Sequence, residues 1–506
     1  MIGEEAQPTW NHILVYTTPA TNALTMSRQQ FLASYGLLCL PGIIIATIFF
    51  FRQYFRHLSR VRVAQRKSER YAILSLKGLS PQPDDEANAK KAMIVVLGDI
   101  GHSPRMQNHA LSLAKMKTKV YMVGYLDSEP QDEILYNPYV ELVVMPSPPR
   151  FLAIFNSKLL YPIAAVIKIT HQIIAMWSAM RYECPKCDFM IVQNPPSLPT
   201  LLISRIVCWA TETRMVIDWH NFGFTILALK LGPAHPLVRL MKYLETRLCH
   251  LADSHFCVSR AMALALRRDL QIDKPIHVLY DRPAQIFQPV TDSADRFAFL
   301  SSQAETTQYV QKIMDGRCAL LVSSTSWTPD ENFDILIDAL VSYSTLATRE
   351  RDDLPFLGVI ITGKGPLRQS YLDKIAALSA EGKLDRVTVK STWLPFEDYA
   401  KVLACATVGI SLPVLGWNDY ASWRELVTEG VDGLGFNSGA ALSDIFVRLF
   451  EGVGETEELA KLKEGAKRQS LRRWDEEWEK VAAPALGYEM KDVNKMPLED
   501  EMQQEN

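Results

Sequence analysis

The feature that most constrains this chain is a regular alternation of short apolar runs with longer runs of helical period, which begins at Ala92. Strands that alternate with helices are typical of βαβ units and parallel sheets. A first set of strands is expected at Met93–Leu97, Val120–Gly124, Glu141–Met145, Phe189–Val192, Met215–Asp218, Ser254–Val258 and Ile276–Leu279. The alternation therefore predicts a doubly wound, Rossmann-like α/β domain over residues 92–280.

The same alternation restarts further along the chain. Strands are expected at Ala319–Ser323, Phe356–Thr362, Val387–Val389 and Thr407–Ser411, which predicts a second Rossmann-like domain over residues 316–488. Residues 281–315, which contain Pro283 and Pro289, are expected to form a linker and a polar insertion. Two such domains should face a cleft, because doubly wound folds bind ligands at the carboxyl ends of their strands. The acidic tail, residues 489–506, is expected to be disordered.

A membrane anchor is predicted near the N-terminus. Phe31–Phe51 contains no charged residue, and a spanning helix needs about 20 apolar residues. Basic residues crowd its C-terminal side, whereas Arg28 is the one basic residue before it. The positive-inside rule then puts residues 1–30 outside the cytosol, makes 52–91 a basic juxtamembrane linker and leaves the remainder cytosolic.

A second apolar stretch, Phe151–Trp177, is interrupted by Lys158, Lys168 and His171. This spacing leaves one helical face apolar, so the stretch is expected either to lie on a membrane or to be a buried helix of the first domain.

Composition excludes some functions. The chain has 54 basic and 57 acidic residues and a net charge of −3, which argues against nucleic-acid binding. Most of its eight cysteines lie in apolar runs, as expected of reduced, buried thiols. Cys184 and Cys187 form a close pair, but no second pair follows at the spacing of a zinc site, so no metal site is predicted.

Two loops of the first domain contain residues suited to binding. The first expected strand is followed by Gly98, Asp99, Gly101, His102 and Arg105. Glycines and free N–H groups at a helix start suit a phosphate, although a tight turn explains them equally well.

A strand expected to end at Asp218 is followed by His220 and Asn221, which should face the cleft. His220 could contact a sugar hydroxyl or a phosphate there, and the alternative is a structural hydrogen bond to a neighbouring loop.

The second domain contains two candidate loops for a diphosphate. Ser324, Thr325, Ser326 and Trp327 follow one strand, and their hydroxyl groups could line such a pocket. Thr328, Pro329 and Glu331 are expected to cap the next helix. Another strand is followed by Gly363, Lys364 and Gly365, where the lysine could reach an anion.

Six segments together resemble the chitobiosyldiphosphodolichol β-1,4-mannosyltransferase family, over roughly residues 92–485. They are GDIGHSPRMQNHALSLAK, QNPPSLP, IDWHNFG, LLVSSTSWTPDENFDIL, ITGKGPL and RWDEEWEKV. The resemblance implies a GT-B fold and an inverting transfer of the first mannose from GDP-mannose to dolichol-diphosphate-linked chitobiose. It also implies no cofactor and no active-site metal. The expected location is the endoplasmic reticulum membrane, in a single pass, with the N-terminus luminal, catalysis on the cytosolic face and related mannosyltransferases as partners.

The resemblance also suggests residue roles. An inverting transfer needs a base for the acceptor hydroxyl, and the candidates are Asp99, His102, Asp218 and His220. His220, with Asp218, is the catalytic prediction. The acceptor side is expected to hold Gly98, Asp99, Gly101, His102, Arg105 and Asn221, and the donor side Ser324–Trp327 and Gly363–Gly365.

This sequence departs from the family between Leu412 and Pro413, where a segment with donor contacts should stand. A parallel crossover needs about a dozen residues, so the strands on either side should not be neighbours. We expect this chain to bind GDP-mannose weakly or not at all, and Glu425 to serve in packing. The alternative function is a non-catalytic membrane-bound scaffold for related transferases, arising from a shortened isoform or a missing exon.

Overall fold

The computed structural model describes residues 53, 56–80, 90–147, 161–283, 286–290, 292–328, 331–410, 415–418, 422–452 and 455–489. It divides into two compact units, Met1–Gln65 and Arg66–Asn506. In the first unit the described residues, 53 and 56–65, are helical. The expected anchor 31–51 lies outside the described residues, as do residues 490–506 of the expected tail. Among the residues described, no helix combines the length and apolarity needed to cross a membrane.

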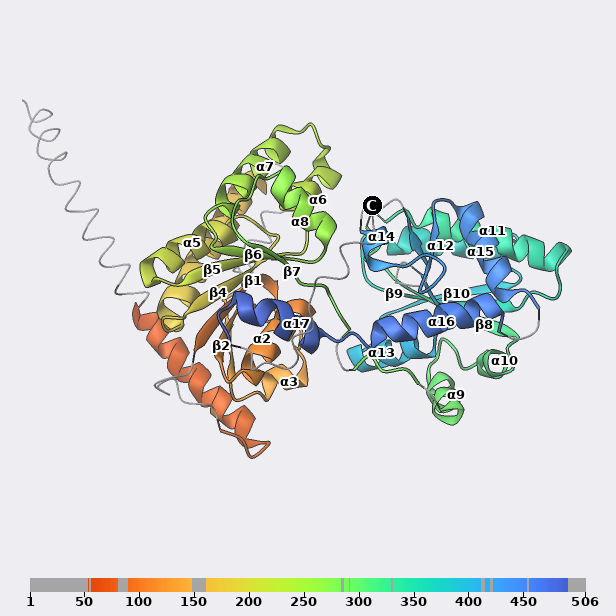
Figure 1. Ribbon diagram of the computed structural model, residues 1–506, viewed down its shortest axis with the longest axis horizontal. Helices are drawn as coiled ribbons and strands as arrows, with labels where there is room; N and C mark the ends of the chain where they lie inside the picture. Colours follow the sequence, from red (N-terminus) through yellow and green to blue (C-terminus); the bar gives the residue numbers. More distant parts are fainter. Residues whose placement is uncertain are drawn as a thin grey trace, which may run out of the picture. The chain divides into compact units, whose positions relative to one another are not determined.

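The second unit contains two parallel sheets, as the alternation predicts (Figure 1). The first has seven strands in the order β3-β2-β1-β4-β5-β6-β7. Its strands are β1 (Lys91–Asp99), β2 (Lys119–Tyr125), β3 (Val140–Val144), β4 (Phe189–Asn194), β5 (Arg214–Trp219), β6 (Ser254–Cys257) and β7 (Ile276–Val278). Strands β2, β4 and β5 are almost wholly buried, as is the middle of β1, residues 92–96, because helices cover both faces of a parallel sheet.

The helices of this first domain are α2 (Pro104–Lys115), α3 (Asp132–Leu135), α4 (Tyr161–Ser178), the π-helix η3 (Ala179–Glu183), α5 (Thr200–Thr211), α6 (Gly223–Leu231), α7 (Pro236–Cys249) and α8 (Arg260–Arg268). In α4, Ala175 and Met176 are buried, whereas Ile167, Ile169 and Ile174 are exposed. The buried-helix alternative for residues 151–177 therefore applies to one face of its C-terminal part.

The second sheet has six strands in the order β10-β9-β8-β11-β12-β13. They are β8 (Cys318–Ser324), β9 (Phe356–Thr362), β10 (Val387–Thr392), β11 (Val408–Ile410), β12 (Leu415–Trp417) and β13 (Leu434–Phe436). Its helices are α11 (Asp334–Arg349), α12 (Arg368–Ala380), α13 (Phe396–Cys405), α14 (Trp423–Leu426), α15 (Gly439–Phe450) and α16 (Glu457–Ser470).

The expected polar insertion contains two helices, α9 (Ser293–Ser302) and α10 (Val310–Met314). The Asp292 side chain caps α9 by accepting from the N–H of Ala294 at 2.8 Å. Leu300 and Ile313 pack into a core cluster with strand β8, so this segment belongs to the second domain's core.

The last helix, α17 (Trp474–Ala485), lies in the range expected for the second domain but packs into the core of the first. Trp474, Trp478 and Ala482 share a buried cluster with strands β1 and β2. The chain therefore passes between the two sheets twice, once after β7 and once before α17.

The expectation that the strands around Leu412 and Pro413 cannot be neighbours is wrong. Strands β11 and β12 pair in parallel, but only at Ile410 and Leu415. Because the last residue of β11, Ile410, pairs with the first residue of β12, Leu415, this pairing does not require a return along the length of a strand. The junction itself, residues 411–414, lies outside the described ranges.

Candidate functional site

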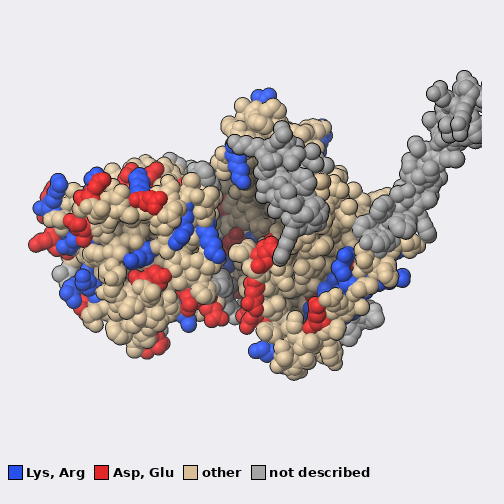
Figure 2. Space-filling view, turned by 180° about the vertical axis from the view of Figure 1, so that it is seen from behind, with Lys and Arg blue, Asp and Glu red and all other residues tan. Residues whose placement is uncertain are grey.

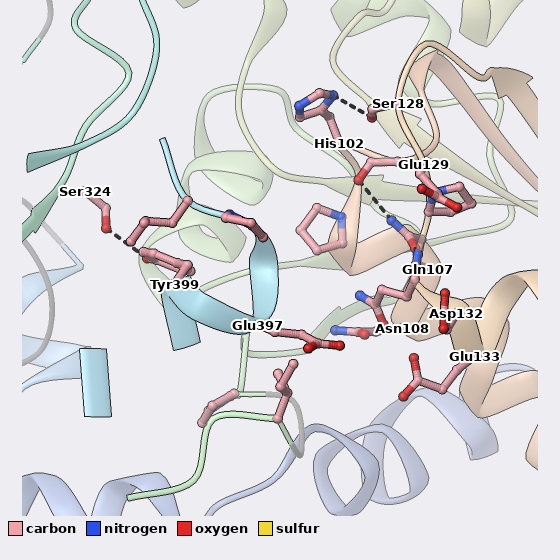
Figure 3. A pocket seen from close by; sticks show the side chains of 18 of the residues that line it. His102, Gln107, Asn108, Ser128, Glu129, Asp132, Glu133, Ser324, Glu397 and Tyr399 are labelled. Carbon is pink, nitrogen blue, oxygen red and sulfur yellow. Dashed lines mark hydrogen bonds between the residues drawn. The ribbon is translucent and has the colours of Figure 1, made fainter. Parts of the chain in front are cut away.

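A pocket of about 1450 Å³ lies at the carboxyl ends of both sheets, as the doubly wound topology predicts (Figure 3). The predicted site residues that line it are Gly101, His102, Ser324, Thr325, Ser326, Gly363 and Lys364. The other predicted site residues, Gly98, Asp99, Arg105, Asp218, His220, Asn221, Trp327 and Gly365, are not among its lining residues. The structure thus brings the first-domain loop at Gly101 and the two donor-side loops together, and leaves the Asp218–Asn221 segment outside this pocket.

Asp99 organises the loop after β1. Its carboxylate contacts His102 Nδ1 at 2.5 Å and also accepts the hydroxyl proton of Ser128 and the backbone N–H of Asp127. Burial opposes ionisation, but the bonds from Ser128 and His102 prevail and lower the pKa of Asp99 to about 2. An ionised Asp99 holds the proton of His102 on Nδ1, which leaves Nε2 of this exposed ring as the free basic nitrogen.

Asp218 is the centre of a second, buried network. Its carboxylate accepts from Arg105 Nε at 2.8 Å and Arg105 Nη2 at 2.9 Å. It also contacts His109 Nε2 at 3.2 Å and His220 Nε2 at 3.0 Å. Burial works against the charge, but Arg105 and the two histidines keep the pKa of Asp218 well below its usual range. Because Asp218 is fully buried and its acceptor sites are occupied, it can orient His220 but cannot itself reach a substrate.

The proton positions in this network follow from Trp478. Its indole N–H can only donate, and it lies 3.0 Å from His109 Nδ1. His109 therefore carries its proton on Nε2 and donates it to Asp218, while burial lowers the pKa of His109 and keeps the ring neutral. His109 is not predicted as a site residue from the sequence, since one histidine in a predicted helix has no local mark of function.

Arg105 also joins the two connections between the sheets. Its Nη1 lies 2.5 Å from Asp281, just after β7, and its guanidinium lies 5.3 Å from the ring centre of Trp474, at the start of α17. Arg105 is predicted from sequence as an acceptor-side residue, but the structure gives it a buried positioning role.

On the donor side, Glu331 folds back onto the loop after β8. Its carboxylate accepts the backbone N–H of Ser326 at 2.9 Å and of Trp327 at 3.1 Å, and also bonds the Thr325 hydroxyl. The predicted capping box is wrong, because α11 begins at Asp334 with Phe333 as its N-cap. The Glu331 carboxylate instead accepts the N–H groups of the loop that precedes it.

The glycines around Lys364 serve close packing of two loops. A Cβ at Gly363 would lie 1.7 Å from the carbonyl oxygen of Thr325, and one at Gly365 would lie 1.8 Å from that of Ser326. Neither position can hold a side chain. The two glycines are therefore explained by close packing of the 363–365 loop against residues 325–326, and not by the predicted approach of the backbone to a ligand. Lys364, which lies between them, lines the pocket.

Lys364 is one of three cations in the described lining of the pocket. Its Nζ lies 4.1 Å from the ring centre of Trp393. The other two cations of the described lining are engaged, since Lys115 pairs with Asp475 and Arg473 donates to the carbonyl of Phe287. Carboxylates also line the pocket, and Figure 3 shows Asp132 and Glu133 on one side and Glu397 on another. An anionic ligand is therefore favoured near Lys364.

Three other predicted site residues, Trp327, Asn221 and Gly98, are not among the lining residues of the pocket. The Trp327 ring is buried against Phe333 at 4.7 Å between ring centres. Asn221 is exposed, and its side chain accepts the N–H of Phe222 at 2.8 Å. A Cβ at Gly98 would meet only Val96, at 3.8 Å, so this position does not require glycine.

Glu425 contacts the first domain. Its carboxylate accepts the N–H of Ala261 at 3.0 Å and the hydroxyl of Tyr280 at 2.7 Å. Burial, followed by the bond to Glu425, raises the pKa of Tyr280 to about 12. Glu425 thus stabilises the start of α8, a packing role of the kind expected for it.

A metal site needs several His, Cys, Asp or Glu side chains grouped together among the described residues. No group of three His, Cys, Asp or Glu within them could hold a metal ion. Cys184 and Cys187 are both buried, and burial raises the pKa of Cys187 to about 12, so these thiols stay protonated.

Solved structures share the two-sheet arrangement. A sucrose-phosphate synthase from Thermosynechococcus elongatus superposes with a TM-score of 0.53 at 14% identity, covering 78% of this chain and 97% of its own. A UDP-forming trehalose-phosphate synthase from Burkholderia vietnamiensis gives 0.53 at 10% identity, covering 79% and 99%. The fold is that of the GT-B class.

Sequence comparison narrows this class, although no family model matches the chain. A chitobiosyldiphosphodolichol beta-mannosyltransferase from Arthroderma benhamiae is 46% identical over 383 residues, covering 71% of this chain and 85% of the relative. The enzyme of the same name from Yarrowia lipolytica is 37% identical, covering 79% and 87%. An Arabidopsis thaliana relative, the UDP-glycosyltransferase TURAN, is 36% identical, covering 78% and 97%. The chain belongs to the chitobiosyldiphosphodolichol β-mannosyltransferase family.

The Arthroderma comparison is longer than the matched part of this chain. It spans 383 residues, which is more than 71% of the 506 residues of this chain. The relative therefore has aligned positions for which this chain has no residue.

Proposed function

We propose that this chain transfers the first mannose from GDP-mannose to dolichol-diphosphate-linked chitobiose. The observation that carries the proposal is family membership over most of the chain, together with a pocket that both sheets line. Lys364 would contact the donor diphosphate, because it lines the pocket on the turn between β9 and α12. We further propose that the reaction uses no cofactor.

The proposed base is His220. Asp218 accepts from its Nε2, so the proton is held there and Nδ1 is left to accept a proton. In an inverting transfer the acceptor hydroxyl oxygen bonds to the anomeric carbon as the bond to GDP breaks, and the hydroxyl proton passes to the base. His102, paired with Asp99 and lining the pocket, is the competing base.

The proposed location is the endoplasmic reticulum membrane, with residues 1–30 luminal, 31–51 spanning and the GT-B part on the cytosolic face. The uncharged run Phe31–Phe51 and the basic residues after it support this topology. Related mannosyltransferases are proposed as neighbours in the membrane.

A non-catalytic scaffold is the second candidate. It is favoured by the short junction between β11 and β12, where only four residues separate Ile410 from Leu415. No helix can form in so short a connection, so donor contacts that such a helix would supply are lacking. The fold and its partner surfaces would persist without them.

The test is an assay of the full-length membrane protein with GDP-mannose and a chitobiosyl-diphosphate lipid. Product formation that is lost in Lys364→Ala supports transfer, and the exposed Lys383→Ala is the matched control. No product, with no GDP binding by calorimetry, supports the scaffold instead. Sequencing the transcript across the codons of Leu412 and Pro413 shows whether a longer form exists for a parallel assay.

The base is tested with two substitutions in the same assay. We expect His220→Asn to lower kcat by about 10²–10⁴-fold, the usual contribution of general acid–base catalysis. His102→Asn is expected to change kcat much less, and the opposite ranking would assign the base to His102.

A further inference from the structure

Helix α6 is an apolar helix with no buried residue. Its sequence, GFTILALKL, begins three positions after His220 and has one charged residue, Lys230. A helix of a globular protein normally buries at least one apolar face. The α6 helix packs mainly along α7, so most of its apolar surface has no partner among the described residues.

Helix α7 extends this apolar surface. Val238, Glu245 and Cys249 face inward and are buried. The outward side chains of the two helices include large apolar groups that are about 40–55% exposed. We call these apolar residues, together with the basic residues Lys230, Arg239, Lys242 and Arg247, the α6–α7 surface. These apolar residues are Ile226 (38%), Leu229 (56%), Leu231 (41%), Leu237 (48%), Leu240 (51%) and Tyr243 (56%).

The charged residues of the α6–α7 surface are all positive. Its four basic residues are exposed, and none forms an ion pair within the described part of the chain. The sole acidic residue from Gly223 to Cys249 is Glu245, which is buried and accepts the N–H groups of Gly223 and Phe224 at 3.0 and 3.1 Å. Figure 2 shows blue and no red on the visible face of the projection at the top of the first domain, where Figure 1 places the α6–α7 connection.

The cations lie against apolar side chains rather than apart from them. Lys242 Nζ lies 5.3 Å from the ring centre of Phe224, and the Arg247 guanidinium lies 5.4 Å from that of Tyr243. Exposed leucines and isoleucines interleaved with basic groups are the composition of helices that lie in the interface of an anionic bilayer. Each Lys or Arg near such a surface adds to the attraction.

We infer that the α6–α7 surface docks on the headgroup region of an anionic phospholipid bilayer, as a second membrane contact apart from the expected anchor at 31–51. The apolar side chains enter the boundary between headgroups and acyl chains, and the four cations meet lipid phosphates. Because α6 begins beside His220, a lipid-linked acceptor would reach the end of β5 directly from the bilayer. That last consequence rests on the proposed function, whereas the docking itself does not.

The test uses the full-length protein reconstituted in vesicles. An environment-sensitive dye is attached to Leu229→Cys or Leu240→Cys in a Cys39→Ala background, where the seven cysteines of the described residues are buried. Vesicles contain phosphatidylserine and brominated acyl chains, which quench the dye on contact. We expect about twofold or greater quenching at both positions and none at a control position, Leu471→Cys, which is 63% exposed in the second domain.

Charge variants complete the test. The triple substitution Lys230→Gln, Arg239→Gln and Lys242→Gln should reduce quenching to the control level. A matched triple at exposed lysines, Lys383→Gln, Lys461→Gln and Lys463→Gln, should leave it unchanged, with circular dichroism confirming that both fold. Equal quenching at Leu471→Cys, or none at either helix position, overturns the inference. The inference is also overturned if shielding of the dye in detergent, without vesicles, increases with protein concentration. That result would identify a second copy of the chain as the occupant of the surface.

Discussion

Trp478 donates its indole N–H to Nδ1 of His109 over 3.0 Å, although 369 positions separate the two residues. This bond connects the last helix, α17, to α2 of the first domain and sets the tautomer that His109 presents to Asp218. The final helix of the chain thereby determines the hydrogen bonds around a residue that orients His220.

Replacement of Trp478 by Phe tests this connection. The variant keeps an aromatic ring in the core but leaves Nδ1 of His109 without a donor, so we expect a loss of about 1–3 kcal/mol in the free energy of unfolding. Urea unfolding followed by circular dichroism measures it. Trp209→Phe is the control, because Trp209 is 76% exposed and should change stability by less than about 0.5 kcal/mol. Equal effects of the two substitutions would contradict the proposed bond.

Asp218→Asn should be the more damaging substitution. It leaves the buried guanidinium of Arg105 without its full counter-charge, and removal of one partner from a buried ion pair costs about 3–5 kcal/mol. We expect this loss in chemical unfolding, together with a lower kcat if transfer is observed. The control is Glu212→Gln, which breaks an exposed pair with Lys186 and should leave the midpoint of unfolding unchanged. A stable Asp218→Asn variant would show that the network does not hold the first domain together.

Stability should fall as the pH is lowered from 7 to 5, with His255 as one cause. Its Nδ1 accepts from Trp219 Nε1 at 3.1 Å, and burial, reinforced by His250 and Arg267, lowers its pKa to about 4 from an ordinary 6.5. Below pH 6.5 His255 binds a proton in the unfolded chain, whereas in the folded protein it does so only near pH 4. This difference removes about 2 kcal/mol of stability by pH 5.

His255→Gln should flatten that pH dependence in part. Some slope should persist, because the pKa of buried His109 is lowered in the same direction. Urea midpoints at pH 7 and pH 5 for both proteins give the measurement. A variant with the same pH dependence as the parent would exclude His255 as a cause.

Gly365→Ala should disturb the donor-side loops. The added Cβ would lie 1.8 Å from the carbonyl oxygen of Ser326, so one backbone must move. We expect a loss of about 1–3 kcal/mol, typical of overpacking, and weaker GDP binding by calorimetry. Gly358→Ala is the matched control, because its Cβ would meet the Cys318 sulfur at an ordinary 3.5 Å. Comparable losses in both variants would contradict a specific role for the contact between the two loops.

Much of the fold could be predicted from the sequence, since the strands of both sheets are short apolar runs that local pattern reveals. Helix α6 is not predicted by the sequence pattern, because a helix that is apolar almost all round has no polar face to mark its period. Glu331 matches the local pattern of a helix cap, but its carboxylate accepts N–H groups of the loop four and five positions before it.

The site was predicted in part. Gly101, His102, Lys364 and the Ser324–Ser326 run line one pocket, because the carboxyl ends of parallel strands place such loops at one edge. Asp218 was assigned a catalytic role, but its burial gives it a positioning one. His109 and Trp478 were missed, since neither belongs to a local motif.

The sequence by itself determined the two parallel sheets, the loops at their strand ends and the family, because these depend on periodicity and on short motifs. Only the tertiary structure decided which of those loops share a pocket, that α17 returns to the first domain, and that β11 and β12 pair at a single position. These features depend on contacts between residues far apart in the chain, and no local pattern encodes such contacts.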